Sequence, residues 1–66
     1  MNKFSAEICR RRGTCGLSVR DAAAEAGISP ATFNRVERGS LPDVLTFKRL
    51  VYWSGMPAAV ALRMIP

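Results

Sequence analysis

One stretch of the sequence, residues 17–39, constrains the fold more than any other part of the chain. Two short segments that favour helix flank a three-residue turn, Gly-Ile-Ser, at 27–29. The first segment, 19–26, is rich in alanine, which favours helix and lets a second helix approach closely. The turn glycine can end one helix in the left-handed conformation, and the serine followed by Pro30 is typical of the start of the next. The pattern predicts two short helices joined by a tight turn.

Helical periodicity elsewhere predicts three more helices. The first covers 2–12, with Phe4 and Ile8 on its buried face. A fourth helix covers 44–54 after the cap Asp43, and a fifth covers 58–64. The apolar stripe expected to face the core on the fourth helix consists of Val44, Phe47, Leu50 and Val51. No alternation typical of strands occurs, so the expected fold class is all-α, a compact bundle of five short helices.

Length and charge narrow the class of partner. The 66 residues are enough for one domain, 1–66, and 48% of them are apolar, which is sufficient for a folded core. Ten Lys and Arg residues against five Asp and Glu residues give a formal net charge of +5. A basic domain of this size favours polyanionic partners such as nucleic acid.

The residue inventory argues against several other classes. The chain has no histidine, and its two cysteines, Cys9 and Cys15, are expected to be free thiols without a partner pair for a zinc site. We therefore expect no catalytic site, no metal, no cofactor and no small-molecule substrate. The longest apolar run, 56–62, is too short to span a bilayer, and no secretory signal is visible. A cytoplasmic protein without a membrane partner is expected.

The spacing around the turn carries a resemblance. Ala23 lies four residues before Gly27, Phe33 and Val36 lie six and nine residues after it, and Gly39 closes the unit. This pattern resembles the phage lambda repressor and Cro-like helix-turn-helix (XRE-type) DNA-binding family. The matching residues between about 4 and 56 are Leu17, Ser18, Ala23, Gly27, Ile28, Ser29, Phe33, Val36, Glu37, Gly39, Pro42, Val44, Thr46, Phe47 and Leu50.

The resemblance implies that the helix after the turn lies in the major groove of double-stranded DNA. The implied base-contacting residues are Ala31, Thr32, Asn34 and Arg35. Asn34 can bond adenine and Arg35 guanine, and each such bidentate pair discriminates by about 1–3 kcal/mol. The implied phosphate contacts within the motif are Ser18, Arg38 and Ser40. Each of these residues is also compatible with an ordinary solvated helix face.

The charge of the motif requires further cations. Residues 18–40 contain three arginines and three acids, so the motif is neutral and the positive excess lies in its flanks. The run Arg10, Arg11 and Arg12 is therefore expected to contact phosphates, although cations also suit a helix C-terminus. By the resemblance, Glu37 is partly buried and pairs with Arg12. Val19 and Pro30 replace the glutamines common in the family, so base readout is expected to rest mainly on Asn34 and Arg35.

Apolar residues near the C-terminus exceed what one buried face requires. Residues predicted to form a homodimer interface are Tyr52, Trp53, Val60 and Met64, with 56–66 as a dimerisation helix. The alternative is that Trp53 and the last helix fold back on the core. A two-fold dimer would require a palindromic operator.

The leading hypothesis is a sequence-specific transcriptional regulator of the small phage or mobile-element type. It would act as a repressor by occupying promoter DNA. The alternative is an antitoxin-like or other protein-interaction module on the same fold, which exposed apolar residues near the C-terminus would suit.

Overall fold

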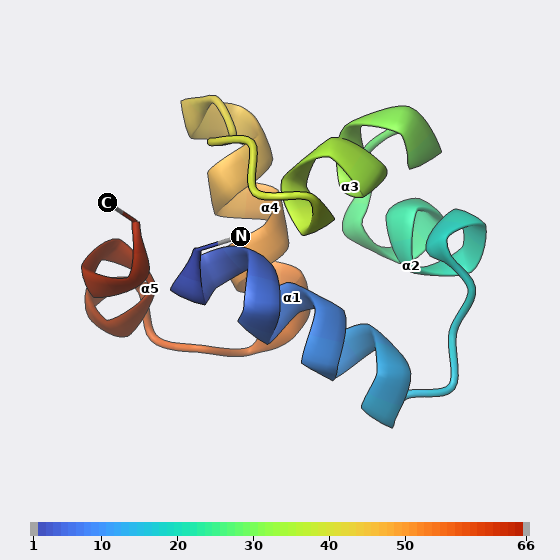
Figure 1. Ribbon diagram of the computed structural model, residues 1–66, viewed down its shortest axis with the longest axis horizontal. Helices are drawn as coiled ribbons and strands as arrows, with labels where there is room; N and C mark the ends of the chain where they lie inside the picture. Colours follow the sequence, from blue (N-terminus) through green and yellow to red (C-terminus); the bar gives the residue numbers. More distant parts are fainter. Residues whose placement is uncertain (1, 66) are drawn as a thin grey trace.

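The computed structural model describes residues 2–65, and these residues form five α-helices and no β-strand. The helices are α1 (Lys3–Thr14), α2 (Val19–Ala26), α3 (Pro30–Glu37), α4 (Val44–Ser54) and α5 (Ala58–Met64). The predicted all-α class is confirmed, as are the bounds of α2, α4 and α5. Along the longest axis of the molecule, α2 lies at one end and α5 at the other (Figure 1). Among the described residues, no helix combines the length and hydropathy of a membrane span.

The first helix is longer than predicted. The Asn2 side chain accepts a hydrogen bond from the Ser5 N–H at 2.8 Å, and Ser5 Oγ accepts one from the Asn2 N–H at 3.0 Å. This reciprocal capping box fixes the start of α1 and is not among the predicted caps. At the other end, Gly13 continues the helix and Gly16, with φ of 69°, follows its end. The predicted end near residue 12 is therefore wrong by two residues, because the left-handed glycine is the second of the two.

The helix-turn-helix unit forms as its sequence predicts. Ser18 Oγ accepts the Asp21 N–H at 3.1 Å, which supplies the hydroxyl half of the predicted capping box of α2. Gly27 ends α2 in the left-handed conformation, with φ of 79°. Ser29 Oγ then accepts the Thr32 N–H at 3.1 Å and caps α3. These local bonds set both ends of the turn before any long-range packing is considered.

Helix α4 turns Leu50 to the core as predicted, with Phe47 and Val51 half-buried against the core. Its buried residues are Thr46, Leu50 and Ser54, which recur every four residues. Ser54 tolerates burial because its hydroxyl donates to the Val51 carbonyl at 2.9 Å. Val44, placed in the buried stripe by the sequence, is 78% exposed. That prediction is wrong, because small hydroxyl residues satisfied within the helix occupy the buried stripe.

The last helix and Trp53 fold back on the core. The Trp53 ring lies edge-on to Phe33 with a centroid distance of 5.5 Å. Ala61 is fully buried in α5, and Met64 packs against the core from the same helix. Trp53 and the last helix therefore adopt the alternative arrangement, folded back on the core, whereas Tyr52 is 90% exposed. The place of these residues in a dimer interface stays a prediction.

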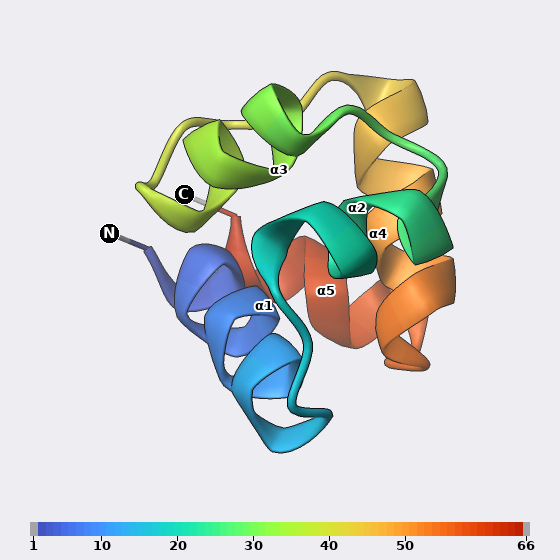
Figure 2. The same ribbon diagram turned by 90° about the vertical axis from the view of Figure 1, so that its right-hand side faces the viewer.

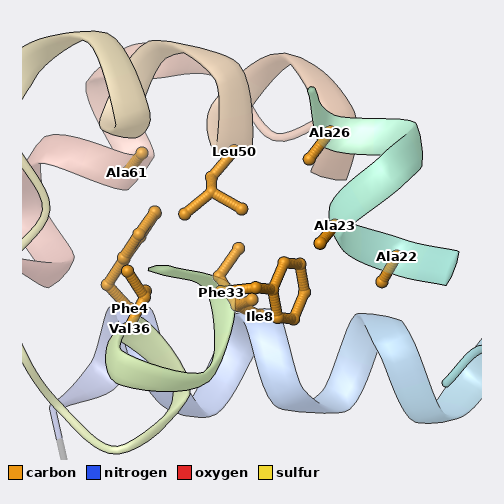
Figure 3. Packing of buried hydrophobic residues seen from close by; sticks show 9 residues of the cluster. All are labelled: Phe4, Ile8, Ala22, Ala23, Ala26, Phe33, Val36, Leu50 and Ala61. Atoms are coloured by element: carbon orange, nitrogen blue, oxygen red, sulfur yellow. The ribbon is translucent and has the colours of Figure 1, made fainter. Parts of the chain in front are cut away.

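The hydrophobic core packs α3 against α2 and α1. Its nine buried residues are Phe4, Ile8, Ala22, Ala23, Ala26, Phe33, Val36, Leu50 and Ala61. In Figure 3, Phe33, Leu50 and Ile8 converge from three different helices. Burying one such large side chain is worth about 1.5–3 kcal/mol. This packing fixes one face of α3 and leaves the opposite face to solvent.

Candidate nucleic-acid interface

The outer face of α3 is polar and open. Ala31, Asn34, Arg35 and Arg38 follow the spacing of one helix face, and all four are exposed. The opposite face carries the buried Phe33 and two neighbouring buried residues of α3. Figure 2 shows α3 along one edge of the molecule, with α1 on its inner side. The structure therefore brings three of the predicted base-contacting residues together on one surface.

The fourth predicted base-contacting residue, Thr32, is half-buried and hydrogen-bonded. Its Oγ1 lies 2.8 Å from Ser29 Oγ and accepts a bond from Arg35 Nη2 at 3.3 Å. The hydroxyl is thus occupied by two neighbours on α3. A guanidinium that is held in one direction loses less conformational entropy when it binds a base edge than a free one.

The predicted phosphate contacts of the motif lie on separate elements. Ser18 is exposed at the start of α2, where the first N–H groups of a helix favour anions. Arg38 and Ser40 are exposed just beyond the end of α3. The Ser40 N–H donates to the Arg35 carbonyl at 3.0 Å, which wraps this segment against the helix.

The arginine run of α1 already has partners within the protein. Arg10 is exposed and forms a bidentate ion pair with Glu7. The hydrogen bond from Arg10 holds the pKa of Glu7 below its ordinary value. The Arg11 guanidinium lies beside Gly55, at the C-terminal end of α4, where a positive charge is favourable. To contact a phosphate, Arg10 would have to leave or share Glu7, and Arg11 would have to move away from the end of α4.

Arg12 forms the structural ion pair that the resemblance implies. Its Nε donates to Glu37 Oε2 at 2.7 Å, and Nη2 donates to Oε1 at 3.3 Å. A third bond runs from Nη1 to the Leu17 carbonyl at 3.0 Å. The bond to Glu37 raises the pKa of Arg12, and burial followed by the charge of Glu37 raises the pKa of the neighbouring Cys9. The predicted pair is confirmed, and it ties α1 to the end of α3.

Two side chains of α4 hold the turn, and sequence reasoning missed both contacts. Arg49 Nη1 donates to the Gly27 carbonyl at 2.7 Å, and Trp53 Nε1 donates to Glu25 Oε1 at 3.1 Å. The donors are one helical turn apart on α4. The sequence contains this spacing but no signal that pairs it with residues more than twenty positions earlier.

An apolar surface lies on α4 and α5, away from α2. Two adjoining grooves share Phe47. The first groove is also lined by Lys48, Val51, Tyr52, Gly55, Met56 and Ala58, and the second by Pro42, Val44, Leu62 and Ile65. Of the predicted dimer residues, Tyr52 and Val60 are exposed, whereas Trp53 and Met64 are half-buried.

Comparison with known proteins agrees with this geometry. A family model described as a helix-turn-helix domain matches residues 3–51, which is most of the chain and includes α1 to α3 and much of α4. No curated protein and no solved structure gave a match. A helix-turn-helix that presents an exposed polar helix is the fold of a DNA-binding regulator. The chain belongs to the helix-turn-helix domain family, as its resemblance to the lambda repressor and Cro-like proteins predicts.

Proposed function

We propose that this protein is a sequence-specific transcriptional regulator that inserts α3 into the major groove of double-stranded DNA. The observation that supports this most directly is the division of α3 into two faces. Phe33 and Val36 are at most 2% exposed and lock the helix to the core, while Asn34 and Arg35 are exposed on the other side. A rigidly held helix with hydrogen-bonding side chains outward is what base readout requires.

The proposed base contacts use complementary chemistry. Asn34 bonds the N6 and N7 atoms of adenine, and Arg35 bonds the O6 and N7 atoms of guanine. Ala31 and the methyl group of Thr32 pack on a thymine methyl group. Because the Thr32 hydroxyl already bonds Ser29 and Arg35, its methyl is the group available to DNA.

The proposed backbone contacts flank α3. Ser18 with the first turn of α2 holds one phosphate, and Arg38 with Ser40 holds another. Arg10 and Arg11 add positive potential from α1, and Arg10 contacts a phosphate only after exchanging its bonds to Glu7. Neutralising Arg10 and Arg11 together is expected to weaken binding to every sequence and to flatten the dependence of affinity on salt. Titrations of a variant with both residues changed to glutamine, at several salt concentrations, measure this.

The proposed regulatory action is repression by occupancy, in the manner of small phage regulators. A bound copy excludes other proteins from promoter DNA, and this needs only the surface described above.

We further propose a homodimer built through the apolar surface of α4 and α5. Tyr52 protrudes beside a groove lined by Phe47, so Tyr52 of each copy can enter the groove of the other. Trp53 and Met64 would border the contact, with Val60 inside it.

Such a dimer would leave both reading helices free, because the polar face belongs to α3, whereas the proposed contact is built by α4 and α5. Two copies would place their α3 helices about 34 Å apart, one turn of DNA. The matching operator is a palindrome with half-sites at that spacing.

Selection of bound duplexes from a random library tests the proposed function. We expect an enriched palindrome whose half-site contains guanine and adenine. The variant Arg35→Ala should lower affinity for that duplex by roughly ten- to hundredfold and relax the preference at one position. The matched control Arg63→Ala removes an exposed arginine from α5 and should change affinity far less. No enrichment, or equal effects of the two variants, would refute the proposal.

The exposed apolar surface also favours a second candidate function, an antitoxin-like protein-interaction module. In that case a partner protein, instead of a second copy, covers Tyr52 and Phe47. Co-purification from a host extract, followed by binding of the isolated partner to wild type and to Tyr52→Glu, distinguishes the two. A partner that binds wild type with high affinity and fails to bind the variant would support the second function.

A further inference from the structure

The turn between α2 and α3 is held from outside by α4. The Gly27 carbonyl accepts a 2.7 Å hydrogen bond from Arg49, and the Glu25 carboxylate accepts a 3.1 Å bond from Trp53. These two contacts, which we call the α4 brace, join the last turn of α2 and its cap to one face of α4. Both donors are anchored on a helix whose Leu50 is fully buried, so the brace starts from a rigid element.

The brace reaches both sides of the turn. Gly27 is the left-handed residue that redirects the chain from α2 into α3. The Trp53 ring also lies 5.5 Å from Phe33, the central buried residue of α3, in an edge-on contact. The same helix, α4, therefore contacts both the turn and the middle of α3.

Arg49 belongs to the positive excess outside the motif, where the charge balance alone would assign it to phosphates. Its guanidinium nonetheless bonds a carbonyl that has no intrahelical partner, at the end of α2. A hydrogen bond from a charged donor to such a carbonyl is stronger than one between neutral groups. The positive charge of Arg49 therefore stabilises the C-terminal end of α2.

We propose that Arg49 is a positioning residue for sequence readout. It sets the angle of α3 through the Gly27 carbonyl and does not itself neutralise a phosphate. This inference rests on the proposed function, because it concerns how α3 is presented to DNA. It separates Arg49 from Lys3, an exposed lysine of α1 that lines neither groove of the apolar surface.

The test compares Arg49→Ala, Arg49→Lys and the control Lys3→Ala, using the selected duplex and a random duplex at several salt concentrations. Arg49→Ala should lower affinity for the selected duplex by about tenfold, the effect of one hydrogen bond to a charged group. Its affinity for random DNA and its salt slope should stay at wild-type values. Arg49→Lys, which retains a donor, should recover part of the discrimination. Lys3→Ala should leave the ratio of selected to random affinity unchanged.

The opposite result identifies a phosphate contact. If Arg49→Ala weakens both duplexes equally and lowers the salt slope by about one, the proposal is overturned. Unchanged affinity for both duplexes would overturn it as well.

Amide hydrogen exchange of the free protein tests the role of Arg49 independently of the proposed DNA-binding function. Arg49→Ala should speed exchange at residues 27–29 and leave α1 unchanged, whereas Lys3→Ala should leave exchange at the turn unchanged. Unchanged exchange at the turn overturns the brace whether or not the protein binds DNA. Failure of the wild-type protein to prefer any sequence refutes the proposed function and leaves this exchange measurement valid.

Discussion

The Thr32 side chain on α3 carries a hydroxyl and a methyl group, and we propose a separate role for each. Its hydroxyl bonds Ser29 and Arg35 within the protein, and its methyl group is the part that we propose contacts a thymine. In this proposal the hydroxyl orients Arg35, whereas the methyl group makes an apolar contact of its own.

Substitutions that remove one group at a time should give opposite specificity profiles. Thr32→Val keeps a methyl group and removes the hydroxyl, so preference for guanine at the Arg35 position should fall by roughly fivefold. Thr32→Ser keeps the hydroxyl and should weaken only the thymine preference. Binding of single-base variants of the selected duplex measures both. Identical profiles for the two variants would contradict the orienting role of the hydroxyl.

The two ion pairs of the described residues differ in burial and should differ in energy. The Glu37 side chain is 8% exposed and bonds Arg12, whereas Glu7 pairs with an arginine side chain that is 60% exposed. Glu37→Ala leaves Arg12 without its main partner and should lower the free energy of unfolding by about 2 kcal/mol. Glu7→Ala, the matched control, should cost less than about 1 kcal/mol. Urea unfolding at neutral pH decides between this and equal losses, which would contradict the structural importance of the buried pair.

At the scale of the element, the helix caps explain why these segments are helical. Serine, asparagine or aspartate caps the starts of α1 to α4, and each cap accepts an N–H of its own first turn. Helix α5 follows Pro57, which supplies no side-chain cap, and it depends on burial of Ala61 for its position. The first four helices are therefore set largely by local bonds, and the last by packing.

The Asp43 cap predicts part of the response to acid. The Thr46 N–H donates to Asp43 Oδ1 at 2.8 Å, and this bond lowers the pKa of Asp43 in the folded protein. The carboxylate thus stabilises the fold above the unfolded pKa of about 4, and this stabilisation is lost as the pH falls through the lower folded pKa. The free energy of unfolding should fall on acidification below about pH 4, and less steeply in Asp43→Asn, which keeps an acceptor without a titrating group. Equal slopes by urea unfolding would contradict this.

Local patterns predicted the elements well, because caps, glycines and helical spacing act over a few residues. The pair of Phe4 and Ile8 and the bounds of α4 are correct for this reason. The rotation of α4 about its axis could not be predicted in the same way. Whether Val44 or Thr46 is buried depends on which neighbours meet the helix, and spacing alone favours the larger apolar residue.

In the candidate site, too, local features could be predicted from the sequence and long-range contacts could not. The exposed face of α3 follows from the spacing of Phe33 and Val36, which leaves Asn34 and Arg35 outward. The bond between Arg49 and the Gly27 carbonyl joins residues 22 positions apart and has no local signal. The pairing of Arg12 with Glu37 was available only through the family resemblance.

For the whole molecule, the arrangement separates two surfaces. The polar face of α3 and the apolar surface of α4 and α5 belong to different helices, and α5 lies far from α2 (Figure 1). In the proposed function, one surface binds DNA while the other binds a second copy. The weak readout expected from two base-contacting side chains makes this second copy important, because two half-sites contribute together.

Dimerisation should depend on Tyr52. Its side chain is 90% exposed, so Tyr52→Glu should leave the helical content unchanged while it places a charge in the proposed apolar contact. Wild type is expected to sediment as a dimer at micromolar concentration and the variant as a monomer. The control Arg20→Glu, an exposed change on α2, should remain dimeric. A wild-type monomer at high concentration in sedimentation equilibrium would contradict the proposed interface.

The central claim, that α3 contacts DNA, is tested most directly by cross-saturation. DNA protons are irradiated in a complex of the selected duplex with deuterated, ¹⁵N-labelled protein, and loss of amide signal marks residues in contact. We expect the largest losses of amide signal at residues 30–38 and near the start of α2, with little loss in α5. Losses concentrated in 44–64, with α3 unaffected, would contradict it.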